Sequence, residues 1–272
     1  MAILKFNDLA TGKINRLIVN MPPRHTKSEF ASYLLPAWMV GRNPKLKIIQ
    51  ATHTGELAVR FGRKAKTLID SEEYSKIFDT TLRDGAQTEG VDFSVEDKNK
   101  IAKVLSEVGV DYIEGGWPGA NPIDTEFFSK PISLGKSIFT AFGMTKKTGR
   151  SAENDPSLSP LINASCPAVC VVGKAWDFHV KIALGINNKD NLENIKDTAK
   201  HIVKNGKEFL FDAEHFFDGY KSNPNYALDC LKHAFDQGAR WLVLCDTNGG
   251  TLPHEVSKIV SEVTKHIPGE NL

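Results

Sequence analysis

Hydrophobic and polar positions alternate in blocks along the second part of the chain. Short runs rich in β-branched and aromatic residues predict six buried strands, at 76–80, 110–114, 137–142, 168–172, 208–213 and 241–245. Apolar residues at helical spacing predict four helices between and after them, over 94–108, 191–205, 224–237 and 254–266. This alternation is typical of a parallel α/β fold, and we expect a (β/α) barrel rather than a doubly wound sheet.

The ends of the predicted helices carry residues suited to capping. Ser94 is followed three residues later by Asp97, which predicts a capping box, and Gly109 is placed to end the same helix. Asn223 precedes Pro224, a pair that suits an N-cap and a first helical position. The apolar stripe of the first of these helices is predicted from four residues, Ile101, Val104, Leu105 and Val108.

Residues 1–77 show a different pattern, in which a buried strand, a proline-rich break and a helix follow one another. A strand, a tight loop, Lys-Ser and a helix make the layout of a phosphate-binding loop, where backbone N–H groups cradle phosphate. Met21 and Thr26 stand where the consensus glycines would be. The pattern therefore predicts a partial P-loop α/β segment, with Lys27 and Ser28 as weak nucleotide-binding residues.

This first segment resembles the large terminase subunit of tailed phages, a DNA-packaging ATPase. The resemblance extends over roughly 12–77 and is carried by the loop Pro-Pro-Arg-His-Thr-Lys-Ser at 22–28. It implies that Lys27 and Ser28 hold phosphate and magnesium. Such a motor also needs an apolar strand that ends in an acidic pair, and none occurs before Phe78. We therefore expect no ATP turnover from this segment.

Charged and polar residues follow the predicted strands of the second segment, at the ends that a parallel barrel gathers into one mouth. They are Arg83, Asp84, Glu114, Asp212, Glu214, His215, Asp246 and Thr247. A single acid at a strand end is often a helix cap or a surface residue, but charged residues at four strand ends indicate chemistry there. We leave His215 out of the catalytic candidates because an extended strand would turn it away from Glu214.

Four motifs in this segment resemble the citramalate synthase and 2-isopropylmalate synthase family, and the citramalate synthase branch most. They are Phe78-Asp79-Thr80-Thr81-Leu82-Arg83-Asp84-Gly85-Ala86-Gln87, Ile113-Glu114-Gly115-Gly116-Trp117-Pro118-Gly119, Asp212-Ala213-Glu214-His215-Phe216-Phe217-Asp218-Gly219-Tyr220 and Cys245-Asp246-Thr247-Asn248-Gly249-Gly250. The resemblance covers 78–272. It implies a Claisen-type condensation of acetyl-CoA with a 2-keto acid, with pyruvate favoured, in branched-chain amino-acid biosynthesis.

The resemblance also implies roles for single residues. Arg83 would stabilise the enolate and the growing oxyanion, and Glu214 would orient the substrate and assist proton transfer. Asp84 would bind a divalent metal, magnesium or manganese, that polarises the ketone. Three further residues would line the keto-acid pocket: Gln87, Glu114 and Thr247.

The same family has two more metal ligands, a His-x-His pair on a seventh strand. The chain has eight histidines, and no two of them are spaced by one residue. We therefore expect an incomplete TIM (β/α) barrel of about six of the eight strands over 78–272, preceded by the partial P-loop segment over 1–77. Metal binding and activity are expected to be impaired as a result.

Charge is divided unevenly between the two segments. Residues 1–77 hold 13 Lys and Arg against 6 Asp and Glu, and the remainder holds 21 against 27. A basic segment favours polyanionic partners, but a solvated basic face is an ordinary alternative, and we expect no nucleic-acid partner. Four cysteines make no disulfide framework, and no apolar run is long enough to span a membrane. We expect a cytoplasmic protein with small-molecule partners, and a homo-oligomer is left open.

Three interpretations follow from these patterns. The first is an acyltransferase of the synthase family, truncated in its barrel. The second is a fragment of a phage DNA-packaging ATPase, and the third is an inactive chimera joined near Ile77. The length of the second segment and its four motifs favour the first.

Overall fold

The computed structural model describes Leu35 and residues 76–272, and the structural statements below concern these residues. The chain divides into two compact units, Met1–Lys76 and Ile77–Leu272, and the second is described here. The P-loop segment and its two candidate residues, Lys27 and Ser28, lie outside the described residues and stay predictions.

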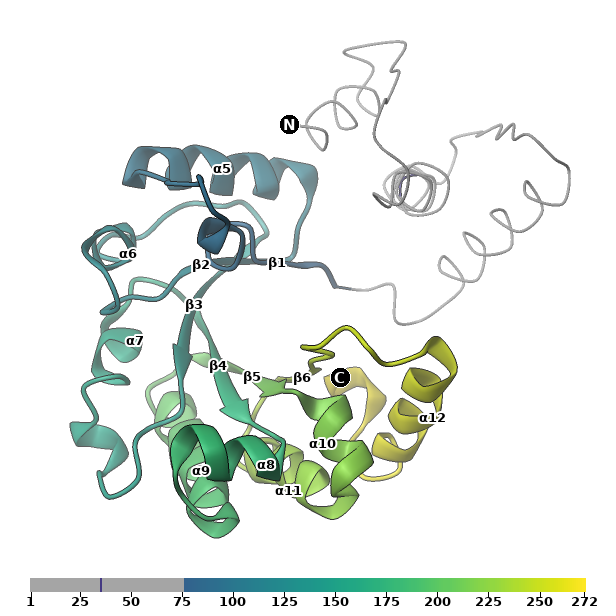
Figure 1. Ribbon diagram of the computed structural model, residues 1–272. Helices are drawn as coiled ribbons and strands as arrows, with labels where there is room; N and C mark the ends of the chain where they lie inside the picture. The colour runs from purple at the N-terminus through teal and green to yellow at the C-terminus, as the bar shows by residue number, and fades with distance from the viewer. Residues whose placement is uncertain (1–34, 36–75) are drawn as a thin grey trace, which may run out of the picture. The chain divides into compact units, whose positions relative to one another are not determined.

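Six parallel strands form one sheet in which each strand pairs with the next along the chain (Figure 1). Their bounds are β1 (Phe78–Asp79), β2 (Tyr112–Gly116), β3 (Ile138–Met144), β4 (Ala168–Lys174), β5 (Glu208–Glu214) and β6 (Trp241–Leu244). All six predicted strands are present. The sequential order confirms the barrel-type sheet, because a doubly wound sheet reverses its strand order at a switch point.

Helices connect the strands and pack against one face of the sheet (Figure 1). The four predicted helices are α5 (Val95–Val108), α9 (Asn188–Lys204), α11 (Pro224–Phe235) and α12 (Pro253–Val263). Shorter helices are α6 (Pro122–Phe127), α7 (Ser159–Asn163), α8 (Asp177–His179) with the π-helix η4 (Val180–Leu184), and α10 (Phe216–Ser222). Three 3-10 turns complete the described elements: η2 (Gly85–Gln87), η3 (Ala152–Asn154) and η5 (Gly269–Asn271).

The predicted caps are confirmed. The Ser94 hydroxyl accepts a hydrogen bond from the Asp97 N–H, and the Asp97 carboxylate accepts one from the Ser94 N–H at 3.1 Å. Gly109 ends α5 in the left-handed region, at φ 96°. At α11, the Asn223 side chain accepts from the N–H of Tyr226 at 3.3 Å. Each cap satisfies backbone groups that have no partner inside their own helix.

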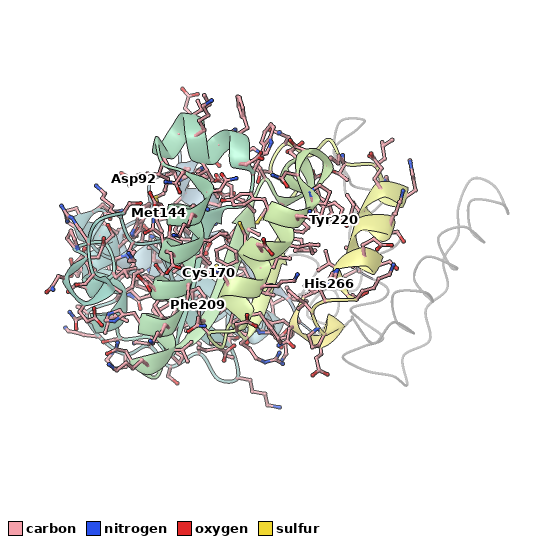
Figure 2. All side chains as sticks on the ribbon, turned by 90° about the horizontal axis from the view of Figure 1, so that it is seen from below. Asp92, Met144, Cys170, Phe209, Tyr220 and His266 are labelled. Carbon is pink, nitrogen blue, oxygen red and sulfur yellow. The ribbon has the colours of Figure 1, made fainter. Side chains whose placement is uncertain are left out.

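Alternation along the strands separates two apolar layers. One face packs on the helices in the main core, and its strand residues include Ile113, Val169, Val171, Phe209, Phe211 and Leu242. The opposite face carries a smaller cluster, Tyr112, Ala168, Cys170 and Leu210. Cys170 and Phe209, one from each face, are both buried (Figure 2). The second face is the inner surface of the open barrel.

A hydrogen-bonded trio occupies the N-terminal end of this inner surface. Tyr112 donates its hydroxyl hydrogen to the Glu208 carboxylate, and Trp241 Nε1 donates to the Tyr112 oxygen at 2.8 Å. Burial raises the pKa of Tyr112 to about 12, so it stays a neutral donor. The trio joins the first residues of β2, β5 and β6.

Among the described residues, no helix is long and apolar enough to cross a membrane.

Candidate active site

An arginine–glutamate pair lies where the first two strands end. Arg83 follows β1 in a tight turn, in which three successive N–H groups from Arg83 onward reach the Thr80 carbonyl oxygen at 2.9–3.1 Å. Glu114 lies in β2 and is fully buried. Arg83 Nε donates to Glu114 Oε2 at 2.6 Å, and the guanidinium carbon lies 4.0 Å from the centroid of the Phe142 ring. The ring and the carboxyl therefore hold the guanidinium from two sides.

Three potential ligand atoms lie close together beside this pair. One atom each from Glu114, Cys170 and Asp212 lies within 4.8 Å of the others. Glu114 Oε1 is buried and has no hydrogen-bond partner among the described residues. Burial raises the pKa of Glu114 to about 7; the Arg83 charge opposes this rise and Asp212 adds to it. Burial also raises the pKa values of Asp212 and of the Cys170 thiol.

Asp84 lies on the outer side of the same turn. Its side chain is 63% exposed, and its Oδ1 accepts a hydrogen bond from Arg83 Nη1 at 3.0 Å. A carboxylate that faces solvent beside the site fits a hard divalent ion as one ligand. Among the described residues, the one group of three or more potential metal ligands is Glu114, Cys170 and Asp212, and Asp84 is not part of it.

Gln87, at the end of η2, lines a cavity of about 340 Å³ together with Arg83. Trp117, after β2, and Phe142, in β3, form part of its aromatic wall, with ring centroids 5.6 Å apart and nearly perpendicular. The structure therefore places Arg83 and Gln87 in the lining of the same cavity. Glu114 and Thr247 do not line this cavity.

Glu214 ends β5 and pairs with Lys174, the last residue of β4. Lys174 Nζ donates to Glu214 Oε2, and the two side chains are 19% and 24% exposed. The strand register sets Lys174 opposite Glu214. Sequence reasoning missed Lys174 because the prediction ended its strand at Val172, two residues too early. A lysine two residues after the end of the predicted strand was the available signal.

His215 corrects one prediction. It does not continue the extended strand: its φ of 53° and ψ of 35° are left-handed, and it caps α10. Its N–H donates to the Thr247 hydroxyl at 2.9 Å, and its ring lies 4.3 Å from that of His179, centroid to centroid. The extended conformation assumed for His215 is therefore wrong, because β5 ends at Glu214. Thr247 lies in the loop after β6 and is exposed.

Comparisons with known proteins assign residues 75–272 to one family model, described as HMGL-like. Over 198 residues the chain is 50% identical to the (R)-citramalate synthase of Aquifex aeolicus, covering 72% of this chain and 38% of that protein. The (R)-citramalate synthase of Geobacter sulfurreducens is 51% identical over 195 residues, covering 71% and 37%. The 2-isopropylmalate synthase of Sulfolobus acidocaldarius is 30% identical over 191 residues, covering 70% and 47%. The chain thus spans under two fifths of the length of the two citramalate synthases.

One solved structure illustrates the likeness in fold. The crystal structure of hydroxymethylglutaryl-CoA lyase from Pseudomonas aeruginosa gives a TM-score of 0.60 at 19% identity, covering 72% of this chain and 66% of that one. At this identity the likeness concerns the fold alone. The matched region of the family model begins at residue 75, and the relatives reported above give no support to the terminase resemblance or to nucleotide binding at Lys27 and Ser28.

Proposed function

This chain belongs to the HMGL-like family, and we propose that it is an acyltransferase that condenses acetyl-CoA with a 2-keto acid, with pyruvate as the favoured acceptor. The choice of acceptor rests on the relatives. Two that are named citramalate synthases are 50–51% identical to the chain, whereas one that is named 2-isopropylmalate synthase is 30% identical. Citramalate is the product that pyruvate and an acetyl group form.

The observation that carries the proposal is the guanidinium of Arg83 at the mouth of the barrel. It lies between the buried carboxyl of Glu114 and the Phe142 ring, and it also lines the cavity that Gln87 shares. A fixed, permanently charged donor at the ends of parallel strands suits a reaction in which an oxyanion develops. Preorganised donors of this kind stabilise the charge without reorganising as it forms.

The chemistry makes one carbon–carbon bond and breaks one carbon–sulfur bond. The methyl carbon of acetyl-CoA loses a proton to a base and attacks the ketone carbon of the acceptor, and the alkoxide that forms takes up a proton. Water then cleaves the thioester and gives a carboxylate and free coenzyme A. In this proposal Arg83 stabilises the enolate and alkoxide oxygens. Glu214, held by Lys174, orients the acceptor and assists proton transfer. Gln87 lines the cavity that Arg83 shares and would contact the acceptor there. Glu114 acts through its hydrogen bond to Arg83, and Thr247 keeps its role as an acceptor-binding residue only on the family resemblance.

Asp84 is the described residue that fits a divalent metal in this proposal. Its exposed carboxylate is a hard oxygen ligand next to Arg83. Bound magnesium or manganese would supply Lewis acidity to the ketone oxygen. Asp84 also accepts a hydrogen bond from Arg83 Nη1, so it helps to orient the guanidinium.

The test is release of free coenzyme A by the full 272-residue chain from acetyl-CoA with magnesium or manganese. Pyruvate, 2-ketoisovalerate and no acceptor are compared. We expect release that depends on pyruvate and falls by about 10²–10³ in Arg83→Ala, the usual effect of removing one oxyanion donor. Arg150→Ala is the matched control, because Arg150 is exposed and lies outside the cavity. A rate of coenzyme A release that is the same with and without an acceptor, or that is unchanged in Arg83→Ala, would contradict the proposal.

A further inference from the structure

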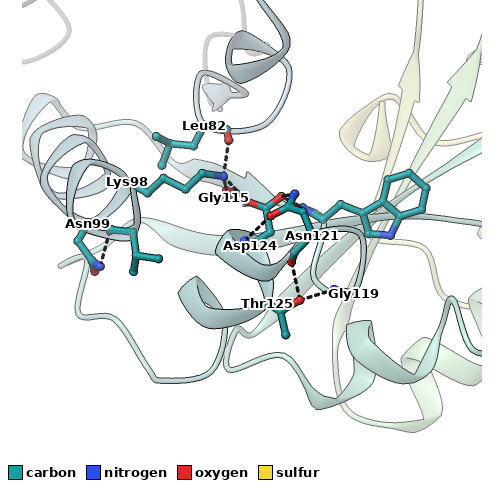
Figure 3. A network of polar contacts seen from close by, with 10 residues as sticks. Leu82, Lys98, Asn99, Gly115, Gly119, Asn121, Asp124 and Thr125 are labelled. Atoms are coloured by element: carbon teal, nitrogen blue, oxygen red, sulfur yellow. Dashed lines mark hydrogen bonds and ion pairs between the residues drawn. The ribbon is translucent and has the colours of Figure 1, made fainter. Parts of the chain in front are cut away.

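A buried lysine joins three segments directly behind the arginine–glutamate pair. Lys98 lies in the first turn of α5 and is 2% exposed (Figure 3). Its Nζ donates to the carbonyl oxygens of Leu82 and Gly115, both at 2.9 Å, and to Asp124 Oδ1. An ammonium group has three hydrogens, and each has an acceptor here. A fully buried lysine is rare unless it is paired in this way.

Two of these acceptors adjoin the site. Leu82 directly precedes Arg83, and Gly115 directly follows Glu114. The carbonyl groups of Leu82 and Gly115 belong to the same peptide links as the N–H groups of the residues that follow them. Lys98 therefore fixes the backbone next to both members of the pair, from the turn after β1 and from the end of β2. Arg83 and Glu114 meet 31 residues apart in sequence, and this one side chain bridges their segments.

The third acceptor, Asp124 in α6, is itself held by the loop after β2. Its Oδ2 accepts from the Trp117 N–H at 2.9 Å and from Asn121 Nδ2 at 3.0 Å (Figure 3). Gly116 allows this approach, since a Cβ there would lie 2.5 Å from the Asp124 carboxyl carbon. The Asp124 carboxylate therefore accepts hydrogen bonds both from Lys98 of α5 and from the loop that carries Trp117. In this way it connects the loop to the helix.

Lys98 also lines the cavity of about 340 Å³, which raises the alternative that it binds a ligand anion directly. Its three hydrogens already point to Leu82, Gly115 and Asp124, so no donor is left for a ligand. The Asp124 carboxylate balances its charge. The arrangement suits a role through other residues rather than contact with substrate.

We infer that Lys98 is a positioning residue, which sets the geometry of the Arg83–Glu114 pair through the carbonyl groups of Leu82 and Gly115. A lysine serves here because its compact ammonium reaches three acceptors in different directions, whereas a planar guanidinium donates in one plane. The inference deepens the proposed function. It rests on that function only for the statement that Arg83 takes part in catalysis. The contact itself joins Arg83 Nε to Glu114 Oε2 at 2.6 Å.

The experiment follows the Arg83 Nε–H signal in ¹H–¹⁵N spectra of the full chain, identified by its loss in Arg83→Ala. This readout needs no turnover, so an inactive chain would refute the proposed function and leave this inference intact. The main variant is Lys98→Met with Asp124→Asn, which removes the lysine without leaving a buried carboxylate unpaired. The control is Lys100→Met, because Lys100 is on the same helix, is exposed and pairs only at the surface with Glu96.

We expect hydrogen exchange at Arg83 Nε–H to become at least about tenfold faster in the double variant, with a changed chemical shift, and to stay unchanged in Lys100→Met. Circular dichroism and cooperative urea unfolding establish that each variant is folded. Lys98→Arg keeps the charge and serves if the double variant does not fold; it should shift the same signal. A folded variant at position 98 whose Arg83 signal keeps its parent shift and exchange rate would overturn the inference, leaving Lys98 a purely stabilising role.

Discussion

The buried carboxyl of Glu114 predicts an unusual dependence of stability on pH. Burial raises its pKa from an ordinary 4.5 to about 7 in the folded chain, against the attraction of Arg83. An acid with a raised pKa stabilises the fold while it holds its proton. Between about pH 4.5 and 7 the unfolded chain has lost that proton and the folded chain retains it, so stability falls as the pH rises through this range.

The magnitude follows from the same pKa values. At about 1.4 kcal/mol for each pKa unit, the difference between 4.5 and 7 corresponds to about 3 kcal/mol of lost stability. Glu114→Gln removes the titration and keeps the size of the side chain. In the parent chain Arg83 Nε donates a hydrogen bond to Glu114 Oε2, and the amide oxygen of the glutamine can accept the same hydrogen bond. We therefore expect the variant to gain about 3 kcal/mol relative to the parent chain between pH 4.5 and 7.5.

The assay is urea unfolding of both chains at four pH values from 4.5 to 7.5. Intrinsic fluorescence is recorded in a Trp38→Phe background, because the other three tryptophans, Trp117, Trp176 and Trp241, belong to the barrel unit. Parallel stability profiles for the parent and the variant would refute the reasoning. A parent that gains stability over the variant as the pH rises would show that Arg83, and not burial, controls the pKa of Glu114.

Two further substitutions test the packing around the site. Tyr112→Phe removes the oxygen that accepts from Trp241 Nε1 at 2.8 Å; the unsatisfied donor should lower the free energy of unfolding by about 1–3 kcal/mol, measured in urea, with coenzyme A release unchanged. Gly116→Ala places a methyl group 2.5 Å from the Asp124 carboxyl carbon, at φ +145°, and should cost more than about 2 kcal/mol. Gly149→Ala is its control, with a positive φ but no atom within 4 Å, and should cost about 1 kcal/mol by thermal unfolding.

The six strands, their parallel order and the helix caps were predictable from sequence because each depends on short-range pattern. The Ser94–Asp97 capping box spans four residues, and both of its hydrogen bonds are present. Arg83 and Glu114 were also placed on the mouth of the barrel from their positions after strands. Their direct contact was not predicted, because no sequence pattern fixes which polar side chains meet across 31 residues.

Lys98 shows why the remaining part of the site was missed. The predicted apolar stripe of α5 included Leu105, which is buried, and Ile101, which packs against the core. It left out Lys98 and Ala102, which α5 also buries. A lysine at a helical spacing of four from an alanine looks like a solvated residue. Only the tertiary acceptors, two carbonyl groups and one carboxylate from other segments, make its burial favourable. These partners are fixed by the fold as a whole.

The charge on the inner surface of the barrel connects stability with the proposed chemistry. Three carboxyl groups act on Arg83: Glu114 and Asp84 accept hydrogen bonds from it, and Asp212 interacts with it electrostatically. Burial raises the pKa of Glu114 and of Asp212. An ionised Glu114 would add a further negative charge beside Arg83 and would oppose the binding of a 2-keto acid. The proton that burial retains on Glu114 leaves more of the guanidinium charge for an anion. On the proposed function, the burial that stabilises the protonated form of Glu114 is therefore also what suits Arg83 to an anionic acceptor.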